Sequence, residues 1–203
     1  DHDHGPHEPI ERLLHEGQQV LVQVIKDPLG TKGARLTTHI TVPSRYLVLM
    51  PNARNIGVSA RIDEEAERQR LKEIVSLHAA AEGLEYGYIV RTAAEAVVAD
   101  ALCRDMDFLL RLWQGISERA ATVTAGSLVY SDLPLVLRTL RDLVDVEIAR
   151  IAIDSPETMQ EVREFATQYI PEMANRVEQY TGERPLFDLH GIEDEIQKAL
   201  ERK

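Results

Sequence analysis

The chain has 203 residues, of which 44% are hydrophobic and 28% are charged, a composition typical of folded globular proteins. A formal net charge of −11 argues against a general nucleic-acid coat, which presents a broad basic face to phosphates. Any contact with a polyanion must therefore come from a local group of cations or from metal ions. The single cysteine, Cys103, excludes a disulfide framework within the chain and fits a reducing compartment.

The N-terminal stretch DHDHGPHEP has no basic segment followed by an apolar one, so it does not match a secretory signal. No apolar run reaches the roughly 18 residues that a membrane helix needs. We therefore expect a cytoplasmic protein without membrane contact. The early histidines, His2, His4 and His7, are open to two interpretations: a metal site or a flexible acidic segment. The second is favoured, because no downstream His or Cys pair has ligand-like spacing.

Two β-rich runs, residues 18–26 and 34–42, alternate apolar and polar positions and flank a turn at residues 28–33. They predict a hairpin that closes a small barrel, with the earlier strands missing. Lys32 stands between Gly30 and Gly33 at the tip of this hairpin. Glycines let a backbone approach a phosphate and lysine supplies a point charge, but on spacing alone a solvated turn lysine is the favoured interpretation.

Strand-like runs continue at residues 45–50 and 56–62, and Asp63 is expected to cap a helix over residues 64–80. His78 lies on the apolar face of that helix, as a core histidine would. Gly83 is predicted to end this unit before a strand over residues 86–92. The final two residues of that strand, Arg91 and Thr92, suit a phosphate, because a guanidinium holds two phosphate oxygens and a hydroxyl adds a donor. The alternative is an arginine paired with a surface carboxylate.

A longer helix follows and ends near residue 121. Its start is ambiguous: Thr92 and Glu95 have capping-box spacing, but the helix can also begin near residue 98. An immediate start would place helix N–H groups beside Arg91. Its apolar residues repeat at helical spacing, which makes Trp113 a core residue rather than a platform for base stacking. These residues are Leu102, Met106, Leu109, Leu110 and Trp113.

Residues 121–133 are rich in turn formers and mark a domain boundary. Beyond them the pattern predicts a helix (133–144), a strand (147–154), a helix (156–170), a strand (176–180) and a final helix from residue 192. This alternation is typical of a small layered α/β domain. The second half is also rich in carboxylates, but none has the pattern of a two-metal nuclease centre. They include Asp132, Asp142, Asp145, Asp154, Glu157, Asp188, Glu193 and Asp194.

Four collinear motifs together resemble the ribonuclease E/G family: VQVIKDPLGTKGARLTTHITVPSRYLVLMP, GVSARID, IVRTAAE and YTGERPLFDLHGIEDEIQKALERK. The wording is nearer to the ribonuclease G branch than to the ribonuclease E branch. The resemblance implies a bacterial endoribonuclease that cuts single-stranded, AU-rich RNA, prefers a 5′-monophosphate end, and acts in rRNA processing and mRNA turnover. It also implies Mg²⁺ at the catalytic centre, a structural Zn²⁺ between protomers, and a homo-oligomer in the full-length enzyme.

The resemblance further implies a mixed α+β organisation with three parts. Residues 1–38 would be the end of an S1 (OB-fold) RNA-binding barrel, residues 39–135 a 5′-sensor, and residues 136–203 part of an RNase H-like subdomain. The family's catalytic aspartates lie in a DNase I-like domain that would follow residue 203, and the first S1 strands would precede residue 1. On this basis the chain is an internal fragment and is expected to be catalytically silent by itself.

Residue by residue, Arg91 and Thr92 match the family pair that holds the 5′-phosphate, and Val48 matches an apolar contact beneath the terminal nucleotide. Ser44 aligns with a position at which ribonuclease E has a glycine that contacts RNA through its backbone. Ala60 aligns with a position at which ribonuclease E has an arginine. Lys32 matches an S1 lysine that contacts RNA. Two rival interpretations stay open: a non-catalytic RNA-binding or regulatory module, and a purely structural role for Arg91 and Lys32.

Overall fold

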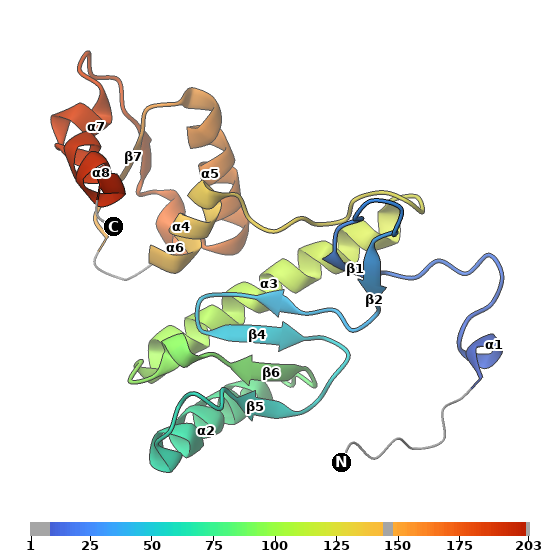
Figure 1. The fold of residues 1–203 in the computed structure, drawn as a ribbon. Helices are drawn as coiled ribbons and strands as arrows, with labels where there is room; N and C mark the ends of the chain where they lie inside the picture. The colour runs from blue at the N-terminus through green and yellow to red at the C-terminus, as the bar shows by residue number, and fades with distance from the viewer. Residues whose placement is uncertain (1–8, 144–147, 202–203) are drawn as a thin grey trace.

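The computed structural model describes residues 9–143 and 148–201 and has the mixed α/β architecture that the sequence predicts (Figure 1). Its strands are β1 (Gln23–Lys26), β2 (Arg35–Thr37), β3 (Val42–Pro43), β4 (Leu47–Met50), β5 (Ile56–Val58), β6 (Gly87–Val90), β7 (Ile151–Ile153) and β8 (Val177–Gln179). Its helices are α1 (Ile10–Leu13), α2 (Glu65–Ala81), α3 (Ala99–Thr122), α4 (Leu135–Leu143), α5 (Pro156–Tyr169), α6 (Pro171–Ala174), α7 (Leu186–Leu189) and α8 (Ile192–Glu201), and a 3₁₀ turn η1 covers Thr92–Ala94.

The largest sheet has the strand order β3-β4-β6-β5, with β4 antiparallel to both of its neighbours and β5 parallel to β6. Alternation sorts its side chains: Leu47 and Leu49 of β4 are fully buried, whereas Val48 between them is only partly covered. On the buried side the sheet packs against α2 and α3, whose apolar faces complete the core (Figure 1). The opposite side of the sheet is left open around Val48 and Ile89, and this side carries the candidate site.

Both ends of α2 bear on the sequence predictions. The predicted cap Asp63 is wrong, because the N-cap is Glu64 and makes no side-chain capping bond. The helix therefore depends on its buried residues rather than on a capping side chain. The stop at Gly83 is confirmed: this residue has φ of +65° and its N–H donates to Ala80, while that of Leu84 donates to Ala79. Glycine adopts this left-handed conformation without a Cβ clash, which explains the sharp end of the helix.

The long helix α3 begins only at Ala99, so the later of its two predicted starts is correct. Thr92 instead opens the 3₁₀ turn, whose N-cap residue Arg91 makes no side-chain capping bond. A helical path cannot pass through the loop because Ala96 has φ of +60°, which lies in the left-handed region. Trp113 is partly buried and packs against the core, as predicted.

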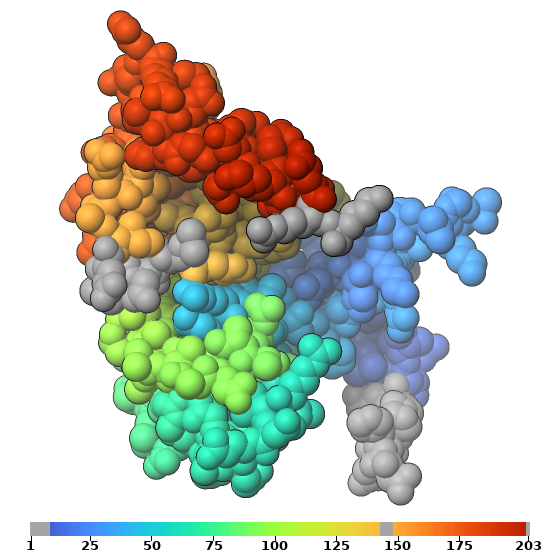
Figure 2. All heavy atoms as spheres, turned by 60° about the vertical axis from the view of Figure 1, so that its left-hand side comes forward, coloured from blue at the N-terminus to red at the C-terminus, as the bar shows by residue number. Residues whose placement is uncertain are grey.

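The C-terminal segment folds around the parallel pair β7–β8, against which α5 packs. Phe108 of α3 meets Phe165 and Tyr169 of α5 with ring centroids 6.2 and 6.3 Å away, which joins this segment to the sheet unit. Figure 2 shows it, in orange and red, stacked on the green and cyan sheet unit, with the blue N-terminal segment at the side. The short helices α6 and α7 were not predicted, and the predicted end of one helix (Val144) and start of one strand (Glu147) lie outside the described residues.

The β1–β2 hairpin forms a separate two-stranded sheet, with the predicted turn closed by two hydrogen bonds between Leu29 and Lys32. Apolar side chains on both strands are open to solvent: Val24 is 54% exposed and Leu36 is 52% exposed. A two-stranded sheet is only marginally stable by itself. These exposed apolar side chains therefore form a surface that another protein segment can cover. No helix in the described part of the chain is long and apolar enough to cross a membrane.

A candidate phosphate site at the end of strand β6

Strand β6 delivers Arg91 and Thr92 to one edge of the four-stranded sheet. The hydrogen-bond pattern continues past the strand itself, because the N–H of Arg91 donates to the carbonyl of Tyr46 at 2.8 Å. On the other side the N–H of Ser59 donates to the carbonyl of Val90, also at 2.8 Å. The two predicted phosphate ligands therefore lie between the turn before β4 and the segment after β5. A surface pocket opens here, lined by Ser59, Arg61, Ile89, Val90, Arg91, Thr92 and Ala93.

An apolar row crosses the open face of the sheet next to Arg91. Val48 pairs with Ile89, and Ile89 pairs in turn with Gly57. Ile89 is 37% exposed, and no atom lies within 4 Å of where a Cβ on Gly57 would be. This row is a shallow apolar surface beside a cation. Such a surface is able to contact the base or ribose of a nucleotide, and the role predicted for Val48 stays a prediction.

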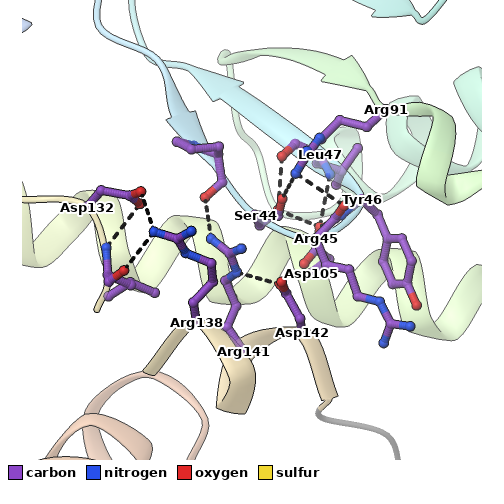
Figure 3. Close-up of polar contacts among 12 residues, drawn as sticks. Ser44, Arg45, Tyr46, Leu47, Arg91, Asp105, Asp132, Arg138, Arg141 and Asp142 are labelled. Atoms are coloured by element: carbon purple, nitrogen blue, oxygen red, sulfur yellow. Dashed lines mark hydrogen bonds and ion pairs between the residues drawn. The ribbon is translucent and has the colours of Figure 1, made fainter. Parts of the chain in front are cut away.

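The Arg91 guanidinium is held by backbone oxygens rather than by an acid. Its Nη1 donates to the carbonyl of Ser44 and, at 3.4 Å, to that of Arg45 (Figure 3). Among the described residues, no carboxylate forms an ion pair with Arg91, so the alternative of a surface salt bridge is not found. Neutral acceptors orient the guanidinium without cancelling its charge, and its remaining N–H groups are available to an anion.

Thr92 adds a hydroxyl at the same rim. Its Oγ1 lies 3.1 Å from Oγ of Ser59, and both side chains are accessible to solvent. Each hydroxyl has one proton, so the hydroxyl that accepts the hydrogen bond between the two can donate its own proton to a phosphate oxygen. Because α3 begins only at Ala99, the N–H groups of that helix are not placed directly after Thr92. The site therefore depends on side chains rather than on a helix N-terminus.

Ser44 is fully buried, and its side chain takes part in a hydrogen-bonded turn. Its hydroxyl donates to Oδ2 of Asp105 at 2.5 Å and to the carbonyl of Leu47 at 3.0 Å. The carbonyl of Ser44 accepts the Arg91 guanidinium. In this structure Ser44, which was predicted among the phosphate-binding residues, reaches the site through its backbone.

Asp105 of α3 organises this turn and was missed by the sequence reasoning. Its Oδ2 also accepts the N–H groups of Tyr46 and Leu47, at 3.0 and 3.1 Å (Figure 3). Burial raises the pKa of Asp105 above its usual range, although the three hydrogen bonds oppose that shift. The available signal was an acidic residue on the apolar stripe of α3, between Leu102 and Leu109, both of which are fully buried.

A second clamp holds the loop that follows Thr92. Glu67 of α2 accepts hydrogen bonds from Nε and Nη2 of Arg70, at 2.6 and 2.7 Å, and from the backbone N–H of Ala96, at 2.9 Å. Arg70 donates in turn to the carbonyl of Val97 at 3.0 Å. The hydrogen bonds from Arg70 and then from Ala96 lower the pKa of Glu67 to about 2. Both sides of the candidate site are therefore tied to a long helix.

The remaining predicted residues lie outside this constellation or at its edge. Lys32 is exposed at the tip of the separate hairpin and does not line the Arg91 pocket. Ala60 is exposed, and its neighbour Arg61 lines the pocket, a cation that the sequence reasoning missed although the two are adjacent in GVSARID. Within residues 9–143 and 148–201, no group of three His, Cys, Asp or Glu side chains is arranged to hold a metal ion. The predicted histidines His2, His4 and His7 lie outside that range.

Comparison with known proteins places this sequence in a family. The model of the ribonuclease E/G family matches residues 41–203. Ribonuclease G of Escherichia coli (strain K12) is 50% identical over 194 residues, covering 96% of this chain and 39% of that protein. Ribonuclease G of Haemophilus influenzae (strain ATCC 51907 / DSM 11121 / KW20 / Rd) is 44% identical with the same coverage. Ribonuclease E of Escherichia coli (strain K12) is 38% identical over 196 residues, covering 18% of that protein.

The chain belongs to the ribonuclease E/G family, which confirms the resemblance in the sequence. Within that family it is more similar to these ribonuclease G relatives than to ribonuclease E of Escherichia coli. The chain spans about two fifths of the length of the ribonuclease G relatives, 39% in each.

Proposed function

We propose that this chain is the RNA-binding and 5′-monophosphate-sensing portion of a ribonuclease G-like endoribonuclease. The observation that carries the proposal is the Arg91 guanidinium, oriented by two carbonyls and free of a carboxylate partner among the described residues. It lies at the rim of a pocket in a protein of a ribonuclease family. RNA is the polyanion that such a protein meets, and a terminal phosphate is the group that suits an arginine with free N–H donors.

Recognition of the RNA end would use three contacts. The terminal phosphate accepts from Arg91 and from the Thr92 hydroxyl, and the first nucleotide lies against the apolar row that begins at Val48. A 5′-hydroxyl offers neither the charge nor the acceptor oxygens of a monophosphate. Since hydrogen bonds to charged groups contribute about 1.5–3 kcal/mol, this difference is large enough to discriminate the two ends.

We further propose the three-part organisation that the resemblance implies. Residues 1–38 would form part of an S1 barrel, which the exposed apolar side chains of β1 and β2 support. Residues 39–135 would be the 5′-sensor, whose sheet and two helices share one core. Residues 136–203 would belong to the RNase H-like subdomain. In this arrangement Lys32 contacts the RNA backbone from the S1 hairpin.

Catalysis is assigned to protein outside these residues. The resemblance places the family's catalytic aspartates outside these residues, so the Mg²⁺ centre and the Zn²⁺ link between protomers are expected in the rest of the enzyme. The whole protein would be a cytoplasmic homo-oligomer that cuts single-stranded, AU-rich RNA in rRNA processing and mRNA turnover. The isolated chain is expected to bind RNA without cutting it. RNA cleavage by the purified chain that EDTA abolishes would refute this expectation.

Fluorescence anisotropy tests the proposed function. One short AU-rich RNA is prepared with a 5′-monophosphate or a 5′-hydroxyl and titrated with the chain. The monophosphate form should bind more tightly, and Arg91→Ala should cost roughly 1–3 kcal/mol for that form and little for the hydroxyl form. Arg54→Ala is the matched control, because Arg54 is exposed and pairs with Glu85 at 2.8 Å.

The two rival interpretations give different results. Equal losses for both RNA ends in Arg91→Ala would assign Arg91 to the RNA backbone in general. Unchanged affinity after Arg91→Ala and Lys32→Ala together would favour a purely structural role for both residues. A non-catalytic RNA-binding or regulatory module would show the binding behaviour described above, but the gene would carry no catalytic domain beyond Lys203.

A further inference from the structure

A second group of cations lies on the other side of the turn that holds Arg91. A pocket opens between α3, the turn and the segment that contains α4 to α6. Its lining includes four arginines from three parts of the chain: Arg45 of the turn, Arg104 and Arg111 of α3, and Arg141 of α4. In a protein of net charge −11, such a local concentration of guanidinium groups is the electrostatic feature that a phosphate contact requires. We call it the arginine pocket.

Among the described contacts of the four arginines, those of Arg45 engage the fewest of its N–H groups. Its Cζ lies 4.8 Å from the centroid of the Tyr46 ring (Figure 3). Among the described residues, its guanidinium forms no hydrogen bond or ion pair. Contact with an aromatic face restricts a guanidinium but uses none of its N–H groups. Arg45 is therefore held in place with all five donors available to a ligand.

Arg111 also keeps its charge. Its Nη1 donates to the carbonyl of Tyr169 at 2.8 Å, and no carboxylate of the described chain pairs with it. The other two arginines are neutralised in part, since Arg104 pairs with Asp100 and Arg141 with Asp142. Each of the four nevertheless has N–H groups beyond those in its recorded contacts.

Two acidic residues, Asp105 and Glu172, line the same pocket, and a negative charge on either would repel an anion. Asp105 directs its Oδ2 to the three donors of the turn, and burial raises its pKa, which disfavours its negative charge. Glu172 is exposed and opposes an anion directly. Arg45 and Arg111, neither of which is paired with an acid in the described chain, outweigh Glu172. The balance at the pocket favours a ligand with one negative charge and two free oxygens.

We propose that the arginine pocket binds an internal phosphodiester of the RNA strand whose 5′ end occupies the Arg91 site, an inference that rests on the proposed function. The two sites share one turn: the carbonyl of Ser44 accepts Arg91, and the next residue is Arg45. Figure 3 shows Arg91 and Arg45 extending in different directions. A strand that leaves the Arg91 site around this turn brings a later phosphate to Arg45 and Arg111.

The test uses the same two RNAs with Arg45→Ala, Arg111→Ala and a control. Each variant should weaken binding by about three- to tenfold for the monophosphate and hydroxyl forms alike, because an internal phosphate is present in both. The slope of log K against log salt should fall in magnitude by about 0.7 for each lost phosphate contact. Arg119→Ala is the matched control: Arg119 is exposed on the same helix and does not line the pocket. Thermal unfolding of each variant shows that it is folded.

The outcomes separate this inference from the proposed function. If Arg91→Ala removes the monophosphate preference while Arg45→Ala and Arg111→Ala bind as the parent chain does, the sensor stands and the arginine pocket is refuted. If no monophosphate preference exists but both variants weaken both RNAs, the pocket stands and the sensor fails. A loss confined to monophosphate RNA would place Arg45 in the terminal site and overturn the inference, as would equal losses in Arg119→Ala.

Discussion

Replacing Asp105 with alanine perturbs the turn that orients Arg91 without touching the candidate site itself. The substitution leaves the N–H groups of Tyr46 and Leu47 without their acceptor. A buried donor left unsatisfied costs about 1–3 kcal/mol. Two features reduce the total: the hydroxyl of Ser44 keeps the carbonyl of Leu47, and removal of a desolvated carboxylate relieves the penalty that raises its pKa. We expect Asp105→Ala to lower the free energy of unfolding by about 2–4 kcal/mol.

Urea unfolding followed by circular dichroism measures this change. Asp107→Ala is the matched control, two positions further along α3. The Asp107 side chain is 39% exposed and pairs with His78 at 2.8 Å, so its removal should cost less than about 1 kcal/mol. If Asp105→Ala destabilises the chain no more than Asp107→Ala does, Asp105 does not organise the turn as described.

The same variant links stability to recognition. The carbonyl of Ser44 accepts the Arg91 guanidinium, so a loosened turn should let that guanidinium adopt several orientations. We expect Asp105→Ala to reduce the preference for 5′-monophosphate RNA under conditions in which the chain is still folded. A full preference in a clearly destabilised variant would mean that Arg91 does not depend on the turn.

Three further substitutions test the surroundings of the site. Ala96→Gly should stabilise the chain by up to about 1 kcal/mol in thermal unfolding, because Ala96 has φ of +60°; a loss of stability would count against that backbone strain. The pKa of Glu67 is lowered from 4.5 to about 2. The stability that its ionised carboxylate contributes is therefore present above pH 4.5 and is lost as the pH falls toward 2. Glu67→Gln should remove that part of the acid sensitivity, and identical acid unfolding curves would exclude the Arg70 clamp. Burial raises the pKa of Tyr88 from 10.0 to about 12. The stability that its protonated hydroxyl contributes is therefore complete below pH 10 and is lost as the pH rises toward 12. Its hydroxyl has no hydrogen-bond partner in the described chain, so Tyr88→Phe should match the parent at neutral pH and exceed it at alkaline pH; a less stable variant would reveal a missed partner.

Local signals in the sequence predicted the features that local chemistry determines. The hairpin turn at residues 28–33 and the helix stop at Gly83 both follow from glycine positions, and both are confirmed. The cap at Asp63 failed because a residue type that often caps helices lies one position too early, and packing sets the helix start instead. The start of α3 was ambiguous for a similar reason: Ala96 has a left-handed backbone conformation, and an alanine in the sequence gives no sign of it.

The candidate site was predicted in part. Arg91 and Thr92 stood out because the sequence predicted a strand that ends with them; the observed strand β6 ends at Val90, and the two residues follow it directly. The depth of Ser44 could not be predicted, because its partner Asp105 is 61 positions away in the chain and reaches it only when α3 packs under the sheet. Arg45 and Arg111 come together through the same packing, so no spacing in the sequence indicates their pocket.

The most direct test of the central claim is an NMR titration of the isotope-labelled chain with one short RNA in its 5′-monophosphate and 5′-hydroxyl forms. The monophosphate form should shift the amides of Thr92 and Ala93 and the side-chain Nε–H of Arg91, with smaller changes at Ser59. The hydroxyl form should leave these signals nearly unchanged. Equal shifts from both forms, or shifts by the monophosphate only at other residues, would contradict a 5′-phosphate site at the end of β6.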